Sequence, residues 1–256
     1  MTKRRRLVLE SFILTLGFFA TQFIDISLRY WAILTLGIVT YFLTAFILKQ
    51  DLTKIGWIVV LPPTSLYVVS ASLFYFLLPQ KLLIRTTILA LFWIGAYAVL
   101  LTQNIYSIAS KYKTIQLLRA AQAVGFIITL LTAFFAYNAL FSFRAASWIN
   151  ALIIFVFSLP LILSSLWSVV LEQTISSRLI TFSLMLSLII AQMSFSLGFW
   201  PLTITTSSLF LVSFLYVSLG IVQSFLSGKL FKNTLREFVQ IGVVIFIITF
   251  FLARWR

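Results

Sequence analysis

A cluster of amide and basic side chains interrupts an otherwise apolar stretch near the middle of the chain. Gln103, Asn104, Arg119 and Gln122 are its members that could do chemistry, because amides donate and accept hydrogen bonds and a guanidinium binds phosphate. A helical hairpin around Lys113 would set Asn104 and Gln122 at one depth, since each lies nine positions from that lysine. Buried amides in hydrocarbon need partners. We therefore expect Gln122 to meet Asn104 or Gln103.

Two uses of this cluster remain open on the sequence alone. The plainer one is contact between neighbouring helices, which Ala121 and Gly125 would assist because small residues four apart allow close approach. The sharper one is a polar pocket for a phosphate or a lipid headgroup, capped by Arg119. In the plainer case Arg119 reaches back to the headgroup region.

Carboxylates are scarce, and none is expected at the membrane centre. The five are Glu10, Asp25, Asp51, Glu172 and Glu237. All lie in expected loops or within one or two turns of an expected helix end, and Glu10 follows Arg6 by the four residues that allow an ion pair on one helix face. The chain has no cysteine and no histidine, which excludes thiol and imidazole catalysis and the usual zinc and haem ligands. We expect no catalytic residue, no metal site and no cofactor.

Two successive prolines, Pro62 and Pro63, fall inside an apolar run. They cannot both occupy a helix interior without freeing carbonyl groups one turn earlier, so we expect a break at residues 61–64. Breaks of this kind line binding sites in many transporters. Alternatively, nearby hydroxyl groups satisfy the freed carbonyls, and Thr64 and Ser65 are well placed to do so.

Membrane helices are the elements that must position these residues. Of the 256 residues, 62% are apolar, 9% are charged and 27 are Phe, more apolar surface than a water-soluble core can hide. The apolar runs are continuous over about 20 residues, whereas barrel strands alternate. We predict an all-α polytopic transmembrane helix bundle of about nine helices, with eight or ten also compatible, forming a single integral membrane domain over residues 1–256 with no soluble domain. The predicted spans are 7–24, 30–48, 55–78, 82–108, 116–141, 147–170, 179–200, 202–226 and 238–252.

The basic residues predict the orientation. With the N-terminus cytoplasmic, 13 of the 19 lysines and arginines fall on the cytoplasmic side, as the positive-inside rule requires. They are spread over many short loops, which argues against a nucleic-acid partner. Lys229, Lys232 and Arg236 cluster before the last span, where we expect contact with anionic lipid headgroups.

Five segments of the chain carry a resemblance. They are LPPTSLY, QNIYSIASKYKTIQLLRAAQAVGF, FSFRAASWINAL, GFWPLT and GKLFKNTLREF. Together they resemble a group of uncharacterised polytopic bacterial membrane proteins, grouped as a domain of unknown function. The resemblance covers most of the chain from about residue 62 onward. It implies a protein of the plasma (inner) membrane of a prokaryote, but it implies no activity, so no site residue is transferred.

Three classes of function suit such a chain. The leading hypothesis is a non-enzymatic, permease-like conduit for a small or lipidic solute, which requires a polar cavity at mid-depth near the proline break. A membrane subunit or scaffold that organises protein partners, or a homo-oligomer, would instead be packed solid with an exposed face of small residues. The third is an enzyme on lipid-linked substrates, for which the sequence offers no evident general acid or base.

Overall fold

A computed structural model of the protein describes residues 3–78, 82–112 and 116–253. Every regular element within these residues is a helix, as the apolar runs predicted. The elements are α1 (Lys3–Thr21), α2 (Ile26–Leu48), α3 (Gly56–Val59), α4 (Pro62–Tyr75), α5 (Leu82–Tyr112), α6 (Leu118–Ser142), α7 (Ser147–Val170), α8 (Ser177–Leu197), α9 (Ile204–Leu226) and α10 (Lys232–Leu252). Of these, α3 and α4 form one interrupted span.

Eight segments in the described part of the chain are long and apolar enough to cross a membrane. They correspond to eight of the nine predicted spans, with α3 and α4 counted together as Gly56–Tyr75. The ninth predicted span is α1, whose 19 residues begin with a run of four basic side chains and include Glu10. Helices satisfy their own backbone hydrogen bonds, which hydrocarbon requires. The protein is therefore a polytopic membrane protein built from helices.

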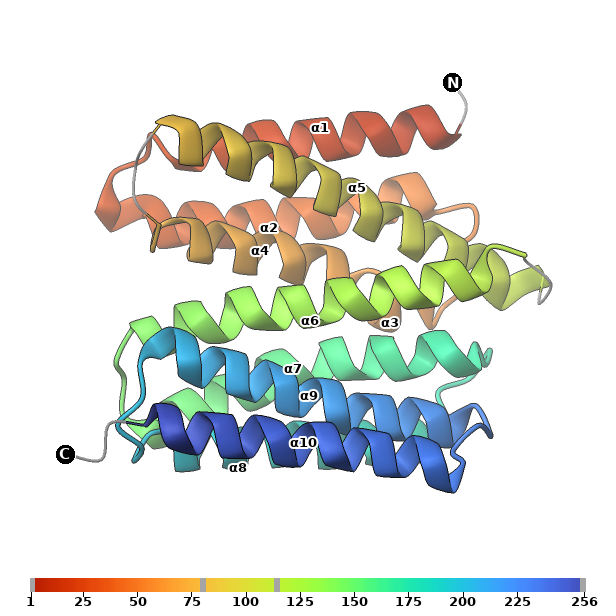
Figure 1. Ribbon diagram of the computed structural model, residues 1–256. Coiled ribbons are helices and arrows are strands. Elements are labelled where there is room, and N and C mark those ends of the chain that lie inside the picture. Colours follow the sequence, from red (N-terminus) through yellow and green to blue (C-terminus); the bar gives the residue numbers. More distant parts are fainter. Residues whose placement is uncertain (1–2, 79–81, 113–115, 254–256) are drawn as a thin grey trace. The chain divides into compact units, whose positions relative to one another are not determined.

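The helices form two compact units, Met1–Thr132 and Ala133–Arg256, and the boundary falls within α6. In the first unit α2 packs along α4, α1 packs along both α5 and α2, and α4 packs on α5, so that four helices enclose one core (Figure 1). Each unit consists of long apolar helices. The sequence-based expectation of one integral membrane domain stays a prediction.

Four buried aromatic side chains pack together in the first unit, with Phe18 and Tyr75 near the C-terminal ends of α1 and α4. The ring of Phe18 in α1 stacks on Phe92 in α5, with centroids 4.2 Å apart, and meets Tyr75 in α4 edge-on at 5.4 Å. Tyr67 of α4 stacks on the same Phe92 at 5.6 Å. Gly95 makes room for Tyr67, because a Cβ atom at this position would lie 2.1 Å from the tyrosine hydroxyl. Phe18, Tyr67, Tyr75 and Phe92 are called the aromatic layer below.

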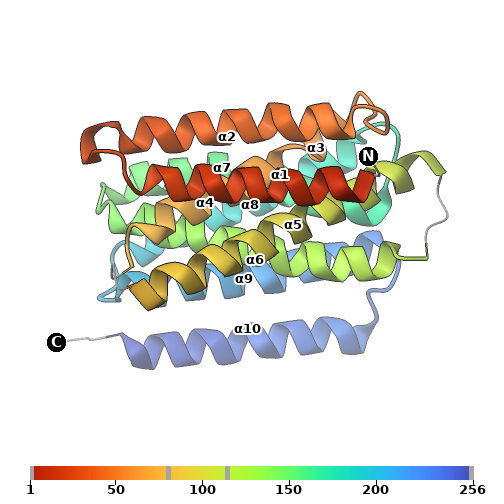
Figure 2. The ribbon, with the colours of Figure 1, turned by 90° about the horizontal axis from the view of Figure 1, so that it is seen from above.

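In the second unit α7 and α8 pack most extensively, and α9 lies against both. Small hydroxyl side chains line this packing, which lets the backbones approach. The buried serines of α7 and α8 are Ser158, Ser164, Ser165, Ser168, Ser183, Ser187 and Ser194. Gln223 of α9 adds a polar contact, donating from Nε2 to the carbonyl (3.0 Å) and the hydroxyl (2.9 Å) of Ser165. Figure 2 shows α10 at the edge of its unit, where it packs mainly against α9.

Candidate functional site

The first helix buries a carboxylate. Glu10 shares one face of α1 with Leu7 and Leu14, at helical spacing, and is only 1% exposed. The hydroxyl of Thr44 in α2 donates a 2.6 Å hydrogen bond to its Oε1. Its Oε2 has no hydrogen-bond partner among the described residues. A half-satisfied carboxylate is costly to bury, and an ionisable side chain inside a membrane protein marks a candidate functional site.

The expected ion pair between Glu10 and Arg6 is not formed. Arg6 is exposed while Glu10 faces the core, because the carboxylate lies on the same stripe of α1 as the leucines that must be buried. The ion pair that the described residues do contain joins Lys3 to Asp51. Glu10 does lie about two turns from the start of α1, as expected, but packing of this stripe against α2 buries it.

Two more buried oxygens face the same core without a partner. Thr64 of α4, with 0% exposure, lies one turn before Tyr67 on the inner face of its helix. Gln103 of α5, with 5% exposure, lies on the buried stripe that also carries Phe92 and Ser107. The Oγ1 of Thr64 and the Oε1 of Gln103 have no hydrogen-bond partner within the described ranges. Both are neutral oxygens able to accept.

These oxygens lie at nearly one depth. Glu10 is eight residues before Phe18 in α1, and Gln103 is eleven residues after Phe92 in α5, which runs antiparallel. Thr64 is five residues before Val69 of α4, which packs against Gly37 of α2, and Thr44 is seven residues after Gly37 in that antiparallel helix. At 1.5 Å per residue, Glu10 lies about 12 Å along α1 from Phe18 and Gln103 about 16 Å along α5 from Phe92, while Thr64 lies about 3 Å from the level of Thr44, the hydrogen-bond partner of Glu10. Less than one helical turn separates them, and with Thr44 they form what we call the polar layer.

The end of the unit beyond the polar layer is tied together by polar contacts. Lys3 at the start of α1 pairs with Asp51 in the loop after α2. Ser107 of α5 donates a 2.8 Å hydrogen bond to the Asp51 carbonyl, and Lys111 donates one of 2.6 Å to the Gln50 carbonyl. The start of α1 and the end of α5 therefore meet at one loop, which fixes their antiparallel register.

The proline break lies beside the polar layer. Helix α3 ends at Val59, and α4 begins with Pro62 and Pro63 in its first turn, where a missing N–H is tolerated. The amide of Leu61 bonds to the Gly56 carbonyl at 3.2 Å, one residue further back than in an α-helix. The carbonyl groups of the three residues Trp57, Ile58 and Val59 thus lose their usual donors.

The hydroxyl groups expected to satisfy these carbonyls do not do so. The Oγ1 of Thr64 and the Oγ of Ser65 have no hydrogen-bond partner in the part of the chain that the structure describes. Tyr41 of α2 takes this role instead, donating a 2.8 Å hydrogen bond to the Trp57 carbonyl. No sequence signal links Tyr41 to the break, because the contact depends on the packing of α2.

The amide-rich stretch makes a close contact between α5 and α6 through a tyrosine. The hydroxyl of Tyr106 donates a 2.8 Å hydrogen bond to the Ala121 carbonyl and lies against Gly125, where a Cβ atom would be 2.2 Å away. The Oδ1 of Asn104 has no hydrogen-bond partner among the residues described. The pairing of Gln122 with Asn104 or Gln103 stays a prediction. Lys113, the expected turn of the hairpin, lies outside the described residues.

The remaining predicted basic residues lie at exposed positions. Arg119 is exposed in the first turn of α6. Lys229 lies in the loop after α9, and Lys232 and Arg236 lie in the first turns of α10, all three exposed. Arg119 is therefore free to reach the headgroup region. Contact of the other three with anionic lipid stays a prediction.

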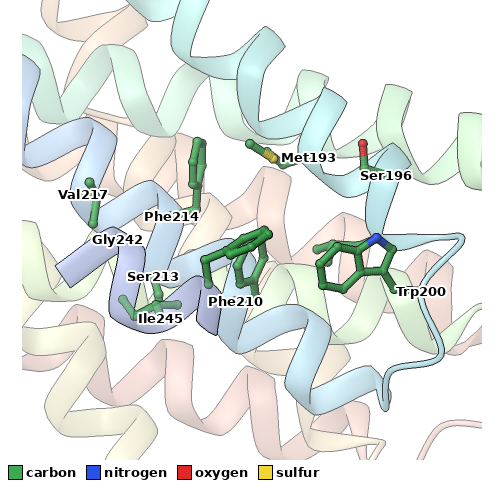
Figure 3. Close-up of a pocket in the computed structure, with 11 residues that line it drawn as sticks. Met193, Ser196, Trp200, Phe210, Ser213, Phe214, Val217, Gly242 and Ile245 are labelled. Atoms are coloured by element: carbon green, nitrogen blue, oxygen red, sulfur yellow. The ribbon is translucent and has the colours of Figure 1, made fainter. Parts of the chain in front are cut away.

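A separate apolar cavity of about 160 Å³ lies in the second unit. Figure 3 shows its lining, which comes from α8, the loop after it, α9 and α10. The residues are Met193, Ser196, Leu197, Trp200, Phe210, Ser213, Phe214, Val217, Gly242, Ile245 and Phe246. An apolar chain would suit this lining, but it offers no charged group. Within the described ranges no cluster of three or more His, Cys, Asp or Glu side chains could hold a metal ion.

Comparison with known proteins gives a family but no activity. No curated protein and no solved structure matches the chain. The sequence profile of one family matches residues 13–252, nearly the whole chain, including the polar layer except Glu10. The chain therefore belongs to the family described as "Protein of unknown function (DUF5656)".

Proposed function

We propose that this protein is a non-enzymatic, permease-like conduit for a small solute in the plasma membrane of a prokaryote, with its path through the first unit. The observation that carries the proposal is the Glu10 carboxylate, which is buried between helices of the first unit and whose Oε2 has no hydrogen-bond partner among the described residues. A protein that only packed helices together would have no need to bear the free-energy cost of this group. The interrupted span α3–α4 beside it has the character of a transporter site, where broken helices offer freed backbone groups.

The arrangement along the unit supports a path that the aromatic layer closes. The polar layer lies on one side of the aromatic layer. On the other side, Arg85 donates from Nε to the Gln22 side-chain oxygen, while the Nε2 of Gln22 and the Nε of Arg29 are buried without a partner in the described part. Polar groups with unused hydrogen-bonding capacity thus lie on both sides of the aromatic layer. An occluded conduit would have this arrangement.

Cysteine accessibility tests this proposal cleanly, because the chain has no cysteine and each introduced thiol is the sole target. Thr64→Cys and Gln103→Cys are placed in the polar layer and treated with a small, cationic, membrane-impermeant methanethiosulfonate on inverted and on right-side-out vesicles. A conduit predicts labelling from the side of the polar layer, since a thiolate forms only where water reaches it. In a Phe92→Ala background, which opens the aromatic layer, labelling should occur from both sides.

Two control positions show the labelling expected of a thiol in water and of a thiol in contact with lipid. Ser227→Cys, in the exposed loop after α9, should be labelled, and Val244→Cys, exposed on the apolar surface of α10, should not. If Thr64→Cys and Gln103→Cys resist labelling as Val244→Cys does, the unit is packed solid. That result would reject the conduit and favour a membrane subunit that organises partners.

A further inference from the structure

We infer that the polar layer is a binding site for a small monovalent cation of the Na⁺ type, held by the Glu10 carboxylate. This inference rests on the proposed conduit, because the same residues line the path, and it names the ion that this path would bind. The observation behind it is a set of three oxygen atoms that lie at nearly one depth in the core of the first unit and have no hydrogen-bond partner among the described residues. They are Oε2 of Glu10, Oγ1 of Thr64 and Oε1 of Gln103.

The number and type of these oxygens point to the class of ion. Each of the three side chains is at least nine-tenths buried, and none of the three atoms has a hydrogen-bond partner in the described structure. Hard cations are ligated by carboxylate, hydroxyl and amide oxygens. A single carboxylate neutralises one positive charge, so a monovalent cation leaves the buried site neutral, whereas a divalent cation would leave an uncompensated charge in hydrocarbon.

A cation satisfies this arrangement better than a proton does. A proton on Oε2 would neutralise Glu10 and make this atom a donor to one neighbouring oxygen, but a single O–H cannot serve the Gln103 and Thr64 oxygens together. A cation about 2.3–2.6 Å from each ligand would engage oxygens from three helices together. The break supplies further oxygen atoms for a cation, because Pro62 and Pro63 cannot donate hydrogen bonds to the carbonyl groups of Ile58 and Val59. The break is one wide turn that keeps helical backbone angles at Val60 and Leu61, and carbonyls freed at helix interruptions coordinate cations in several transporter folds.

The neighbouring positive charges do not oppose binding strongly. Lys3 is paired with Asp51, and Lys111 donates to a backbone carbonyl. Lys3 is seven residues from Glu10 along α1, or about 10 Å at 1.5 Å per residue. The paired Asp51 carboxylate offsets the charge of Lys3, so that this lysine adds little net positive potential at Glu10. The carboxylate therefore dominates the potential at the polar layer.

The test measures binding without any transport. The purified full chain in detergent is unfolded by heat while NaCl replaces choline chloride at constant ionic strength and pH. Choline is too large for the site, so only Na⁺ should raise the unfolding temperature, by roughly 5 °C at saturation. The rise should saturate with concentration. It should vanish in Glu10→Gln and persist in Glu237→Gln, a matched change of an exposed carboxylate.

A second variant covers the case in which Glu10→Gln does not fold. Gln103→Leu retains the carboxylate but removes one ligand, and we expect it to shift the half-saturating Na⁺ concentration upward about tenfold. Equal stabilisation by choline, stabilisation that follows pH alone, or a larger effect of Mg²⁺ or Ca²⁺ than of Na⁺ would each overturn the inference. Saturable Na⁺ binding in a protein whose Thr64→Cys thiol is never labelled would leave this inference standing and reject the conduit.

Discussion

The hydroxyl of Tyr41 donates a 2.8 Å hydrogen bond to the main-chain carbonyl of Trp57, joining α2 to the end of α3. The contact matters because the Leu61 amide, the usual donor to this carbonyl, bonds instead to Gly56. An unsatisfied carbonyl in hydrocarbon would cost several kcal/mol. Tyr41 thus lets the span remain interrupted directly before the two prolines.

Replacing Tyr41 with phenylalanine should destabilise the protein by about 1–2 kcal/mol, because it leaves the Trp57 carbonyl without its donor. The measurement is the free energy of unfolding in detergent. Tyr97→Phe is the matched control, since the hydroxyl of Tyr97 makes no hydrogen bond to the described part of the protein, and it should change stability by less than about 0.5 kcal/mol. Equal losses in both variants would mean that the break does not depend on Tyr41.

Replacing Thr44 with valine should cost about 1–3 kcal/mol of stability, because it removes the donor to the buried Glu10 carboxylate while conserving volume. Thr35→Val is the control on the same helix. Its exposed hydroxyl donates only to the Ala32 carbonyl of its own helix, so the cost should be close to zero. In the Glu10→Gln background the loss from Thr44→Val should shrink, and strictly additive losses would show that the two side chains do not interact.

The features that the sequence predicts correctly depend on residues close together in the chain. The burial of Glu10 was not predicted, because it depends on how helices pack. The helical spans follow from continuous apolar runs, and the interruption lies directly before Pro62 and Pro63 because missing N–H groups act within one turn. Burial of Glu10 depends on which stripe of α1 faces α2. Glu10 falls at helical spacing with Leu7 and Leu14, but the sequence does not show which side of α1 packs against α2.

The hydrogen-bond partners inside the site could not be predicted from the sequence either, because they too depend on how the helices pack. Thr64 was expected to satisfy a nearby carbonyl, because it lies close to the break along the chain. The structure uses Tyr41, which is 16 residues from Trp57 in sequence and reaches it only through packing. Likewise, Ala121 and Gly125 predicted a close helix contact, but the side chain that fills it, Tyr106, is specified by the register of α5 on α6.

Gly125→Ala should destabilise the protein by about 1–3 kcal/mol, although alanine ordinarily favours a helix over glycine by about 1 kcal/mol. The added Cβ would lie 2.2 Å from the Tyr106 hydroxyl and 3.2 Å from its Cζ. Removing the hydroxyl in Tyr106→Phe should relieve most of the clash, so that Gly125→Ala costs clearly less in that background. Thermal unfolding of the four proteins in this cycle gives the answer, and a cost that is independent of residue 106 would contradict the contact.

The orientation of the helices gives a prediction that needs no purified protein. Reporter fusions after Lys54 and Lys232 should report the cytoplasmic side, and a fusion after Arg144 should report the outside, because most basic residues then face the cytoplasm. A fusion after Lys113 should also read cytoplasmic. A cytoplasmic signal at Arg144 would overturn the order of the spans around α6 and α7.

Lys229, Lys232 and Arg236 should stabilise the protein in anionic bilayers beyond what orientation alone requires. Each exposed basic residue near an anionic surface contributes about 1 kcal/mol at physiological salt. We therefore expect the stability difference between anionic and neutral bilayer discs to fall by about 2–3 kcal/mol when all three are replaced by glutamine. Raising the salt to about 1 M, where the screening length is about 3 Å, should abolish most of the difference in the unaltered protein. The charge-conserving variant Lys229→Arg/Lys232→Arg should behave as the unaltered protein does. Equal stability of the unaltered protein in neutral and anionic discs would limit these residues to setting the orientation of α10.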